Sequence, residues 1–584
     1  MKKLSLLLAF GWLSALSFAQ VSFTIVEPAS IAGGYAFTSN GDGPNWGLAN
    51  LNDPNDAVID TVVLADDGTQ GINAQGIPFA NEACSPLLND LTGKIAMVYR
   101  YDGSSSNVCY VGTKVLNAQN AGAIGVIVVN RDESVYGYNG TTDGPLTNIP
   151  FAFISKSDGA LIRSKIDAGE DVVAFIGNKL GLYNDDAGIG RKTTLAPKQA
   201  AVLTQTSQNG SEFNFDLGTT IYNFGQNDQT NVVVTASVSG PAGTWSETVG
   251  PFSIASTDSL DILTGGVNHI PGFSLSSYPD GLYTLDYDLD LGIADESSFD
   301  NHLSYNFMVS DSVFTYADID IAEYMPVPNY YTRSVDPGFK ACLVYNDPNG
   351  SRVGLKGLHL TATMAWDVTA PLEGESVDVY VYQWNDVFTD LNDPNVGFNE
   401  LVDIAYGTHE FSANQDSVMV YVPFQEPIIL EDNQRYLTCV EVYNDDIWLG
   451  YNNRIDYVRN VSHYLQPLFP SSGNAIYYYL GFGEELAPAI ALSTFESSEL
   501  NVNKINEVNA KIYPNPVEDA LYISIPDFKS GVLKITDLSG RLVQGEQQIG
   551  SISKIDVSGL SQGYYIASIY GNDGSIGQYQ FVKN

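Results

Sequence analysis

The sequence is poor in basic residues and lacks a long apolar segment beyond its first twenty residues. Its 584 residues include 27 Lys and Arg against 68 Asp and Glu, a formal net charge of -41 at pH 7. A field of that sign repels phosphate backbones, so nucleic acid is excluded as an expected partner. No later run reaches about 18 unbroken apolar residues, so we expect no membrane-spanning helix.

Histidines are scarce as well, and the five do not form a catalytic pattern. They stand apart in the sequence, and no His-Glu-x-x-His run is present to bind zinc. The sequence therefore predicts no catalytic residue and favours a protein that is not an enzyme, while a catalytic triad assembled by the fold stays open as an alternative. These histidines are His269, His302, His359, His409 and His463.

The first nineteen residues have the pattern of an export signal. Lys2 and Lys3 precede an apolar run from Leu4 to Leu16, and small residues at 17 and 19 fit a cleavage site. Four cysteines in an exported chain favour disulfides over metal or catalysis. Three connectivities exist for four cysteines, and proximity in the sequence favours pairing the first two and the last two. These pairs are Cys84 with Cys109 and Cys342 with Cys439.

Residues 20–185 mix strand and helix patterns. Apolar runs such as "IGVIVVN" (124–130) indicate strands covered on both faces, and "TKVLNAQNAGA" (113–123) has helical spacing that ends at Gly122. The order "ACSPLLNDLTGKIAMVYR", Lys114, "NAQNAGAIGVIVVN" and "NIPFAFIS" resembles the protease-associated (PA) domain. That resemblance implies an α/β fold and a surface for protein or peptide interaction. Here a longer loop, "YDGSSSNVCYVGTK", follows the strand, which puts the contacts of the usual short loop in doubt.

Residues 186–200 carry Gly, Pro and a local basic cluster and are predicted to be a linker. From 201 to 312, short strands between Gly, Asn and Asp turns predict a β-sandwich, and "YNFGQNDQTNVVV" with "GLYTLDYDLD" is similar to CARDB-like, immunoglobulin-type modules. Asp286, Asp288 and Asp290 alternate, so we expect them on one strand face, either solvated or binding Ca²⁺. No other cofactor is expected.

Residues 313–497 alternate apolar and polar residues and are rich in aromatics, which predicts a second β-sandwich, of jelly-roll type or similar. Tyr380, Tyr382 and Trp384 share one strand face by the two-residue period. They are therefore either core residues or a platform that stacks on a sugar ring or a peptide.

The polar segment 498–510 is predicted to be an exposed tether, and 511–584 to be a small β-sandwich. "YPNPVEDALYISI", "ITDLSGRLV", "LSQGYYIASI" and the final "YQFVKN" resemble the type A C-terminal sorting domain of the type IX secretion system of Bacteroidetes. The resemblance implies export by the type IX machinery, removal of the tail, and release or attachment to lipopolysaccharide at the cell surface. Its motif residues here are Tyr513, Pro514, Asn515, Pro516, Gly540, Gly563 and Tyr565.

These patterns together predict a multidomain, mainly β protein: an α/β PA domain, two β-sandwiches and a small C-terminal sandwich. We expect a secreted or cell-surface protein that binds an extracellular protein, peptide or glycan. The PA resemblance implies that the protein binds a protein or peptide without catalysis. The alternatives are a secreted hydrolase with its active site in 313–497 and a carbohydrate-binding surface protein.

Overall fold

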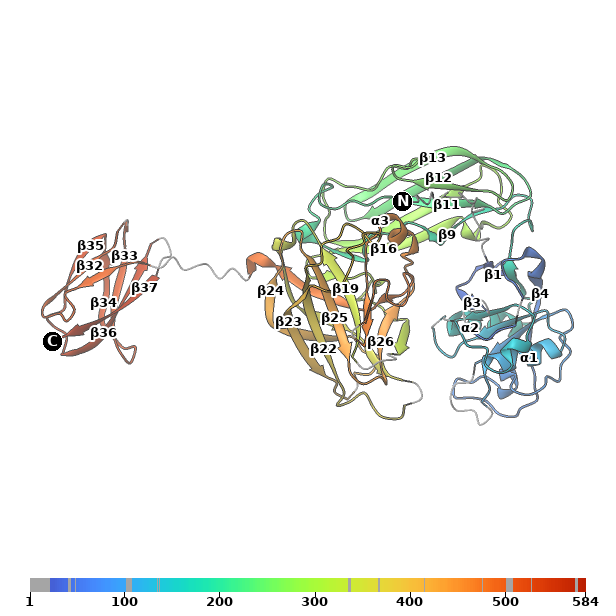
Figure 1. Ribbon diagram of the computed structural model, residues 1–584, viewed down its shortest axis with the longest axis horizontal. Coiled ribbons are helices and arrows are strands. Elements are labelled where there is room, and N and C mark those ends of the chain that lie inside the picture. Colours follow the sequence, from blue (N-terminus) through green and yellow to red (C-terminus); the bar gives the residue numbers. More distant parts are fainter. Residues whose placement is uncertain are drawn as a thin grey trace, which may run out of the picture. The chain divides into compact units, whose positions relative to one another are not determined.

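The computed structural model describes residues 21–584 except 40–43, 48, 101–107, 134, 136, 334–337, 366–367, 414, 475, 500–507, 527 and 573–575. The predicted leader, residues 1–19, lies outside the described residues. Strands dominate and form several separate sheets (Figure 1), which confirms the predicted mainly β, multidomain fold. The chain divides into two compact units, one ending at Glu496 and one formed by residues 497–584.

The first part of the chain folds around an eight-stranded sheet of order β2-β1-β8-β4-β5-β6-β7-β3, in which β4 to β7 run parallel. Helices α1 (Val111–Asn120) and α2 (Lys156–Asp167) pack into separate clusters of buried residues, which contain alternate residues of β5 and β6. Coverage of both faces explains why these strands are continuously apolar. The strands are β1 (Val21–Glu27), β2 (Gly33–Gly34), β3 (Phe37–Ser39), β4 (Val58–Leu64), β5 (Ile95–Tyr99), β6 (Gly125–Val129), β7 (Phe151–Ile154) and β8 (Val173–Asn178).

The predicted linker at 186–200 is wrong, because most of it is strand. β9 pairs with β11, and Ala187, Ile189 and Leu195 are buried. Two sheets follow, of order β14-β11-β9 and β10-β16-β15-β12-β13. Their strands are β9 (Ala187–Thr194), β10 (Ala201–Leu203), β11 (Gly218–Asn223), β12 (Gln229–Gly240), β13 (Gly243–Ile254), β14 (Ser259–Leu263), β15 (Gly281–Asp290) and β16 (His302–Ser310).

Residues 313–496 form a sandwich from a sheet of order β17-β30-β20-β24 and a six-stranded sheet of order β23-β22-β25-β19-β27-β28. A third sheet, β18-β26-β21, also includes β29, and α3 (Val458–Tyr464) precedes β27. The strands are β17 (Val313–Phe314), β18 (Tyr330–Arg333), β19 (Phe339–Asn346), β20 (Val353–Leu360), β21 (Ala362–Met364), β22 (Ser376–Trp384), β23 (Leu401–Glu410), β24 (Val420–Ile429), β25 (Arg435–Val442), β26 (Ile447–Asn452), β27 (Ser471–Gly473), β28 (Ile476–Tyr478), β29 (Ala487–Pro488) and β30 (Ala491–Glu496).

One continuous cluster of buried apolar residues runs from β9 through β11–β16 and on into the 313–496 sandwich. Phe215 and Leu285 belong to this cluster together with Tyr316 and Val379. The two β-rich parts therefore share a core rather than each enclosing its own.

The C-terminal unit has a core of its own, formed between sheets of order β31-β32-β35 and β34-β33-β36-β37. Leu521, Ile523 and Ile525 alternate into it, as the period of two predicts. The strands are β31 (Lys511–Tyr513), β32 (Ala520–Ser524), β33 (Gly531–Asp537), β34 (Leu542–Ile549), β35 (Ile552–Asp556), β36 (Gly563–Gly571) and β37 (Ile576–Lys583).

Both predicted cysteine pairs are bonded in the structure, Cys84 to Cys109 and Cys342 to Cys439. The second pair joins directly opposed residues of β19 and β25 and is buried under an aromatic cluster. It closes a loop with a sequence separation of 97 residues, which restricts the unfolded chain strongly.

We expect the Cys342→Ala/Cys439→Ala variant to lose about 2–5 kcal/mol in the free energy of unfolding, because the long loop is no longer closed in the unfolded state. Guanidinium titration followed by tryptophan fluorescence measures the loss. The matched Cys342→Val/Cys439→Val variant fills more of the vacated volume and should lose a similar amount. Unchanged unfolding midpoints in both variants would contradict a stabilising role for the bond.

Candidate functional site

Polar side chains gather at the carboxyl ends of the parallel strands β4 to β7. Arg100 directly follows β5 and Asn130 directly follows β6, and Arg100 Nη1 donates to Asn130 Oδ1 at 3.0 Å. The guanidinium of Arg100 also lies 5.0 Å from the ring centre of Tyr138. Ligands of open α/β sheets usually bind at this edge, so it is a candidate binding site.

A fully buried lysine fixes the loop beside this edge. Lys114, in the first turns of α1, donates from Nζ to the backbone oxygen of Glu82 at 2.6 Å and lies 3.4 Å from Cys84 Sγ. Burial lowers the pKa of Lys114 to about 8, against the opposing effect of the Glu82 and Asp67 carboxylates. The desolvated amine thus holds the backbone next to the disulfide rather than contacting solvent.

The Cys84–Cys109 bond completes this attachment and leaves apolar side chains exposed around it. Asn117 Nδ2 donates to the backbone oxygen of Ala83 at 2.9 Å, which is a second bond from α1 to the same segment. Val108 and Tyr110, on either side of Cys109, are 55% and 67% exposed. We call residues 83–84 and 108–110 the disulfide rim. A covalent bond joins its two segments, Asn117 holds the Ala83 oxygen and Lys114 holds the adjacent Glu82 oxygen, while the side chains of Val108 and Tyr110 face solvent.

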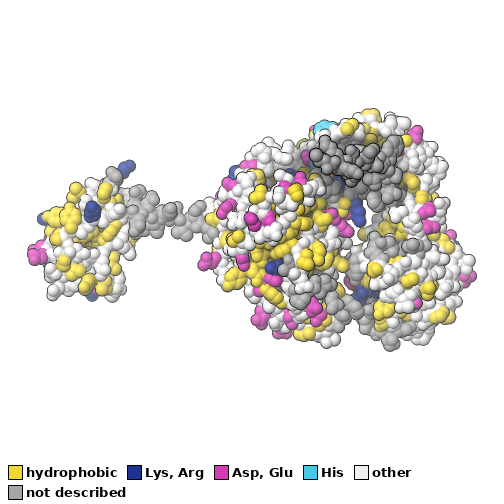
Figure 2. All heavy atoms as spheres, in the orientation of Figure 1, with side chains coloured by type: hydrophobic (Ala, Val, Ile, Leu, Met, Phe, Trp, Pro, Cys, Tyr) yellow, Lys and Arg dark blue, Asp and Glu magenta, His cyan; other side chains and the backbone are white. Residues whose placement is uncertain are grey.

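The predicted aromatic row lies on the outer face of the six-stranded sheet. Tyr380, Tyr382 and Trp384 share that face, whereas Val379 and Val381, which alternate with the tyrosines, belong to the sandwich core. The rings of Tyr380 and Tyr382 stack at 5.8 Å. Figure 2 shows hydrophobic side chains, tyrosines included, gathered over the surface where Figure 1 places β22–β25.

Lys340 on β19 organises the exposed part of this row. Its Nζ donates to the Tyr382 hydroxyl at 2.8 Å, lies 5.1–5.2 Å from the centres of both tyrosine rings, and is 3.5 Å from Glu441 Oε2. Burial raises the pKa of Tyr382, so its hydroxyl stays protonated at neutral pH. The result is a tyrosine pair with a cation at its edge, which we call the tyrosine face.

Trp384 differs from the two tyrosines because a loop covers it. Its indole is buried, donates from Nε1 to the Gly397 backbone oxygen at 2.8 Å, and stacks on Phe398 at 4.4 Å. The 385–400 loop therefore covers Trp384 and removes it from the exposed row. The alternation of residues along a strand does not predict such a loop. Tyr380 and Tyr382 alone are open to a ligand.

The alternating aspartates on β15 lie on one face, as predicted, and two of them face a histidine. His302 Nδ1 is 2.8 Å from Asp288 Oδ1, and its Nε2 is 3.8 Å from Asp286 Oδ1. Asp290 accepts a hydrogen bond from the Gly292 amide. Among the residues that the structure describes, no group of three His, Cys, Asp or Glu side chains is arranged to hold a metal ion. The Ca²⁺ hypothesis stays a prediction.

The other histidines also have partners. His463 Nε2 lies 2.8 Å from Asp216 Oδ2, which brings α3 against the loop before β11. His409 contacts Gln415, His359 packs on the Tyr421 ring, and His269 Nδ1 accepts from the Gly265 amide. His463 with Asp216 and His302 with Asp288 are two acid–base pairs that the sequence could not show, because their members lie in different elements.

A Gly-x-Ser-x-Gly run at 559–563 is a further feature that the sequence reasoning did not single out. Ser561 and Tyr565 help to line a cavity of about 360 Å³. The run leads into strand β36 rather than into a helix, and residues 497–584 contain no histidine. It therefore lacks the strand–turn–helix context and the base of a nucleophile elbow.

The sorting-motif residues pack against the last strand of the C-terminal unit. Asn515 Oδ1 accepts from the Val582 amide at 2.9 Å, and Asn515 Nδ2 donates to the Gln580 backbone oxygen. Pro514 and Pro516, on either side of Asn515, carry no amide hydrogen and cannot extend the ladder themselves. The "YPNP" segment is thus fixed beside β37 by one side chain.

The remaining motif residues form turns and ring contacts. Gly540, with a φ of +82°, permits the turn between β33 and β34, and Tyr513 stacks on Tyr522 at 5.8 Å. Gly563 begins β36, and the Tyr565 hydroxyl donates to the Ser561 backbone oxygen at 2.7 Å.

Family models match two parts of the chain. A PA domain model matches residues 52–162, and a secretion system C-terminal sorting domain model matches residues 511–583. The chain therefore contains a PA domain and a type IX sorting domain that marks it for secretion and the cell surface. Among the described residues, none of the helices has the length and hydropathy needed to span a membrane. Comparison with curated proteins gives no match.

Solved structures give only partial similarities. An aminopeptidase from Aneurinibacillus sp. strain AM-1 has 23% identity over 27% of this chain and 30% of its own, at a TM-score of 0.19. A zinc aminopeptidase from Bacillus subtilis has 18% identity over 27% of this chain and 29% of its own, at a TM-score of 0.18. A CARDB domain from Pyrococcus furiosus, in complex with di-metal ions, has 12% identity over 22% and 94%, at 0.16. The chain thus spans under a third of the length of both peptidases, and TM-scores this low carry no argument.

The buried lysine predicts a pH dependence of stability. Its folded pKa of about 8 lies below the unfolded value of 10.5, so between these values the unfolded chain binds the proton and the folded chain does not. Stability from this group therefore rises with pH in that window, by about 3 kcal/mol at most.

Unfolding of the protein and of the Lys114→Met variant, measured from pH 7 to 11, isolates this contribution, because the ionisation of buried tyrosines affects both alike. We expect the stability of the unaltered protein relative to the variant to increase from pH 8 to 10.5. A constant difference would show that Lys114 keeps its ordinary pKa.

Proposed function

We propose that the protein is a non-catalytic binding protein of the cell surface, and that its PA domain holds an extracellular protein or peptide at the disulfide rim. The observation that carries the proposal is the exposure of Val108 and Tyr110 on either side of Cys109, which a disulfide joins to a segment that Lys114 holds at Glu82. Exposed aromatic side chains on a fixed backbone lose little conformational freedom on binding, which favours affinity.

Charge supports the choice of partner. The net charge of -41 is carried by a surface with few cations, whereas the rim side chains at 108 and 110 are uncharged. A partner is then recognised through apolar and aromatic contacts, with the acidic surroundings disfavouring acidic partners.

The Tyr110→Ala/Val108→Ser variant should capture its partner from the host's extracellular proteins, or from a peptide library, at least about tenfold less, because truncated hot-spot residues typically cost 2 kcal/mol or more. Tyr110 makes no side-chain hydrogen bond as the residue before α1, so its removal leaves the helix intact. Leu161→Ser, an exposed change on α2, is the matched control. Equal capture by all three proteins would refute the proposed site.

A second candidate function, carbohydrate binding, is favoured by the tyrosine face. Two stacked phenol rings with an ammonium at their edge offer both the apolar plane and the hydrogen bonds that a sugar ring requires. Trp384 contributes only by supporting the sheet below the 385–400 loop.

On a glycan array, the Tyr380→Ala/Tyr382→Ala variant should lose binding that the unaltered protein shows, because both rings of the stack are removed. Tyr421→Ala, which removes an exposed tyrosine from β24 in the opposite sheet, should retain it. Retention by the double variant would exclude the tyrosine face as the glycan site.

Fewer observations support the hydrolase alternative. His463 with Asp216 is its best acid–base pair within reach of residues 313–497. Its ring contacts Tyr464, and the Asp216 amide donates to the Tyr464 hydroxyl. These contacts fix α3 against the neighbouring β-sheet and give the pair a role in packing.

A further inference from the structure

Three ionisable side chains are buried together where the PA-like part meets the following β-rich part. Lys179 directly follows β8, Asp186 directly precedes β9, and Asp300 ends a short 3-10 helix, Ser298–Asp300. Their side chains are 1%, 0% and 5% exposed. Lys179 Nζ lies 2.6 Å from Asp186 Oδ1 and 2.9 Å from Asp300 Oδ2. One amine is therefore enclosed by two carboxyl groups.

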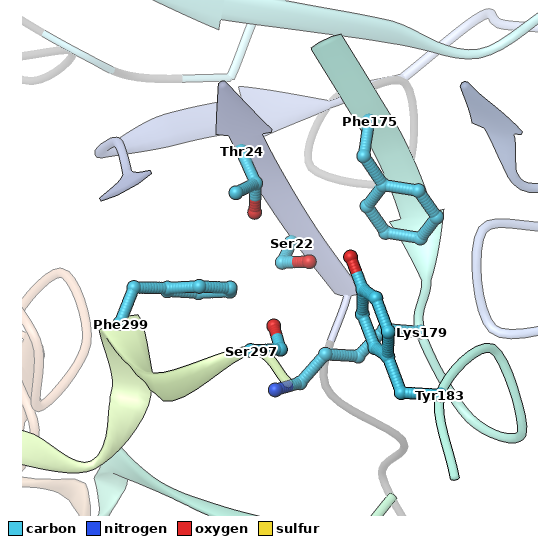
Figure 3. A pocket seen from close by; sticks show the side chains of 7 residues that line it. All are labelled: Ser22, Thr24, Phe175, Lys179, Tyr183, Ser297 and Phe299. Atoms are coloured by element: carbon cyan, nitrogen blue, oxygen red, sulfur yellow. The ribbon is translucent and has the colours of Figure 1, made fainter. Parts of the chain in front are cut away.

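Aromatic rings and a few hydroxyl side chains surround this triad. The Lys179 amine lies 4.6 Å from the ring centre of Phe224 and 4.9 Å from that of Phe299. Figure 3 shows Phe299, Phe175 and Tyr183 around it. Such a site makes three separate charges costly, because each has lost its hydration.

Few hydrogen bonds compensate for that cost. Lys179 donates to Asp186 Oδ1, but Asp186 Oδ2 and both oxygens of Asp300 have no hydrogen-bond partner among the described residues. Buried carboxylates normally collect donors on all their oxygens. The Lys179 nitrogen is in ion-pair contact with Asp300 Oδ2 at 2.9 Å.

The backbone on both sides is held in position. Glu296 accepts hydrogen bonds from the amides of Asn184 and Asp185, and Asp295 accepts from the amide of Ala187. A Cβ on Gly188 would lie 2.1 Å from Asp300 Oδ2, so only glycine leaves room for that carboxyl group. The three groups are therefore preorganised at the separation that reaction requires.

We propose that Lys179 and Asp300 condense into an intramolecular isopeptide bond, with Asp186 transferring the protons. Asp186 takes a proton from the Lys179 ammonium, and the neutral Nζ attacks Cγ of protonated Asp300. The C–OH bond of the tetrahedral intermediate then breaks as Asp186 returns this proton to the leaving hydroxyl and takes the second proton from the nitrogen, so that Asp186 ends protonated. The products are one amide and one water, and no oxidant or co-reactant is consumed.

Two properties of the site support each step. Burial raises the pKa of Asp300 to about 6, which favours the protonated acceptor, and raises that of Asp186 to about 7, which makes its carboxylate a stronger base toward the Lys179 ammonium. A cavity of about 10 Å³ beside Lys179, lined by Ser22, Thr24 and Ser297 among others, has about the volume that one water needs. It can accept the water released by the reaction.

Peptide mapping by mass spectrometry tests the bond on the full chain expressed without its predicted leader, after reduction of the disulfides. We expect peptides containing residues 179 and 300 to appear joined, with a mass lower than their sum by one water. The Lys179→Ala variant should yield separate peptides of full mass. Lys198→Arg, at a lysine that packs on the Tyr464 ring, should retain the joined peptides.

Asparagine variants separate the two carboxyl groups. Asp300→Asn can still be attacked and should join with loss of ammonia instead of water, whereas Asp186→Asn should leave the peptides separate. Separate full-mass peptides from the unaltered, folded protein would overturn the proposal whatever the variants do. A bond from Lys179 to Asp186 would overturn the assignment of Asp300 as the acceptor.

Discussion

The burial of one lysine between two aspartates, at the junction of the α/β sheet and the β-rich part, constrains the whole larger unit. Lys179 leaves β8 and Asp186 enters β9, so the turn between these parts is fixed by their contact, and Asp300 adds the 3-10 helix before β16. Removing one member of such a group leaves an uncompensated buried charge, which typically costs 3–5 kcal/mol. The position of the PA domain against its neighbour thus depends on the contact of one buried amine with two buried carboxyl groups.

Lysines also position their neighbours at the disulfide rim and on the tyrosine face. Lys114 and Lys340 are each surrounded by groups that use the amine as a donor, in one case a backbone oxygen and in the other a tyrosine hydroxyl. In a chain with 27 basic residues, these lysines are used to position neighbours rather than to cover the surface. The two candidate binding surfaces are accordingly apolar and aromatic, with their cations serving as supports.

Local signals in the sequence predicted the parts of the structure that depend on local physics. The apolar run of β6, the end of α1 near Gly122 and the alternation of β32 all follow from backbone period or glycine conformation. The strand β9 was missed because its glycines and basic residues suit a linker, and only its pairing with β11 buries it. Burial of Trp384 depends on a later loop, and the Lys179 triad joins residues far apart in the chain. Such long-range contacts produce no periodic pattern in the sequence.

The separate core of the C-terminal unit has a consequence for maturation. Val517, Ile535 and Phe581 pack among themselves, and among the described residues their cluster begins at Val508. A protease that cuts between the two units would therefore leave the core of the C-terminal unit whole. The sorting domain and the remaining chain would each keep their own fold, which is what removal of a sorting domain needs.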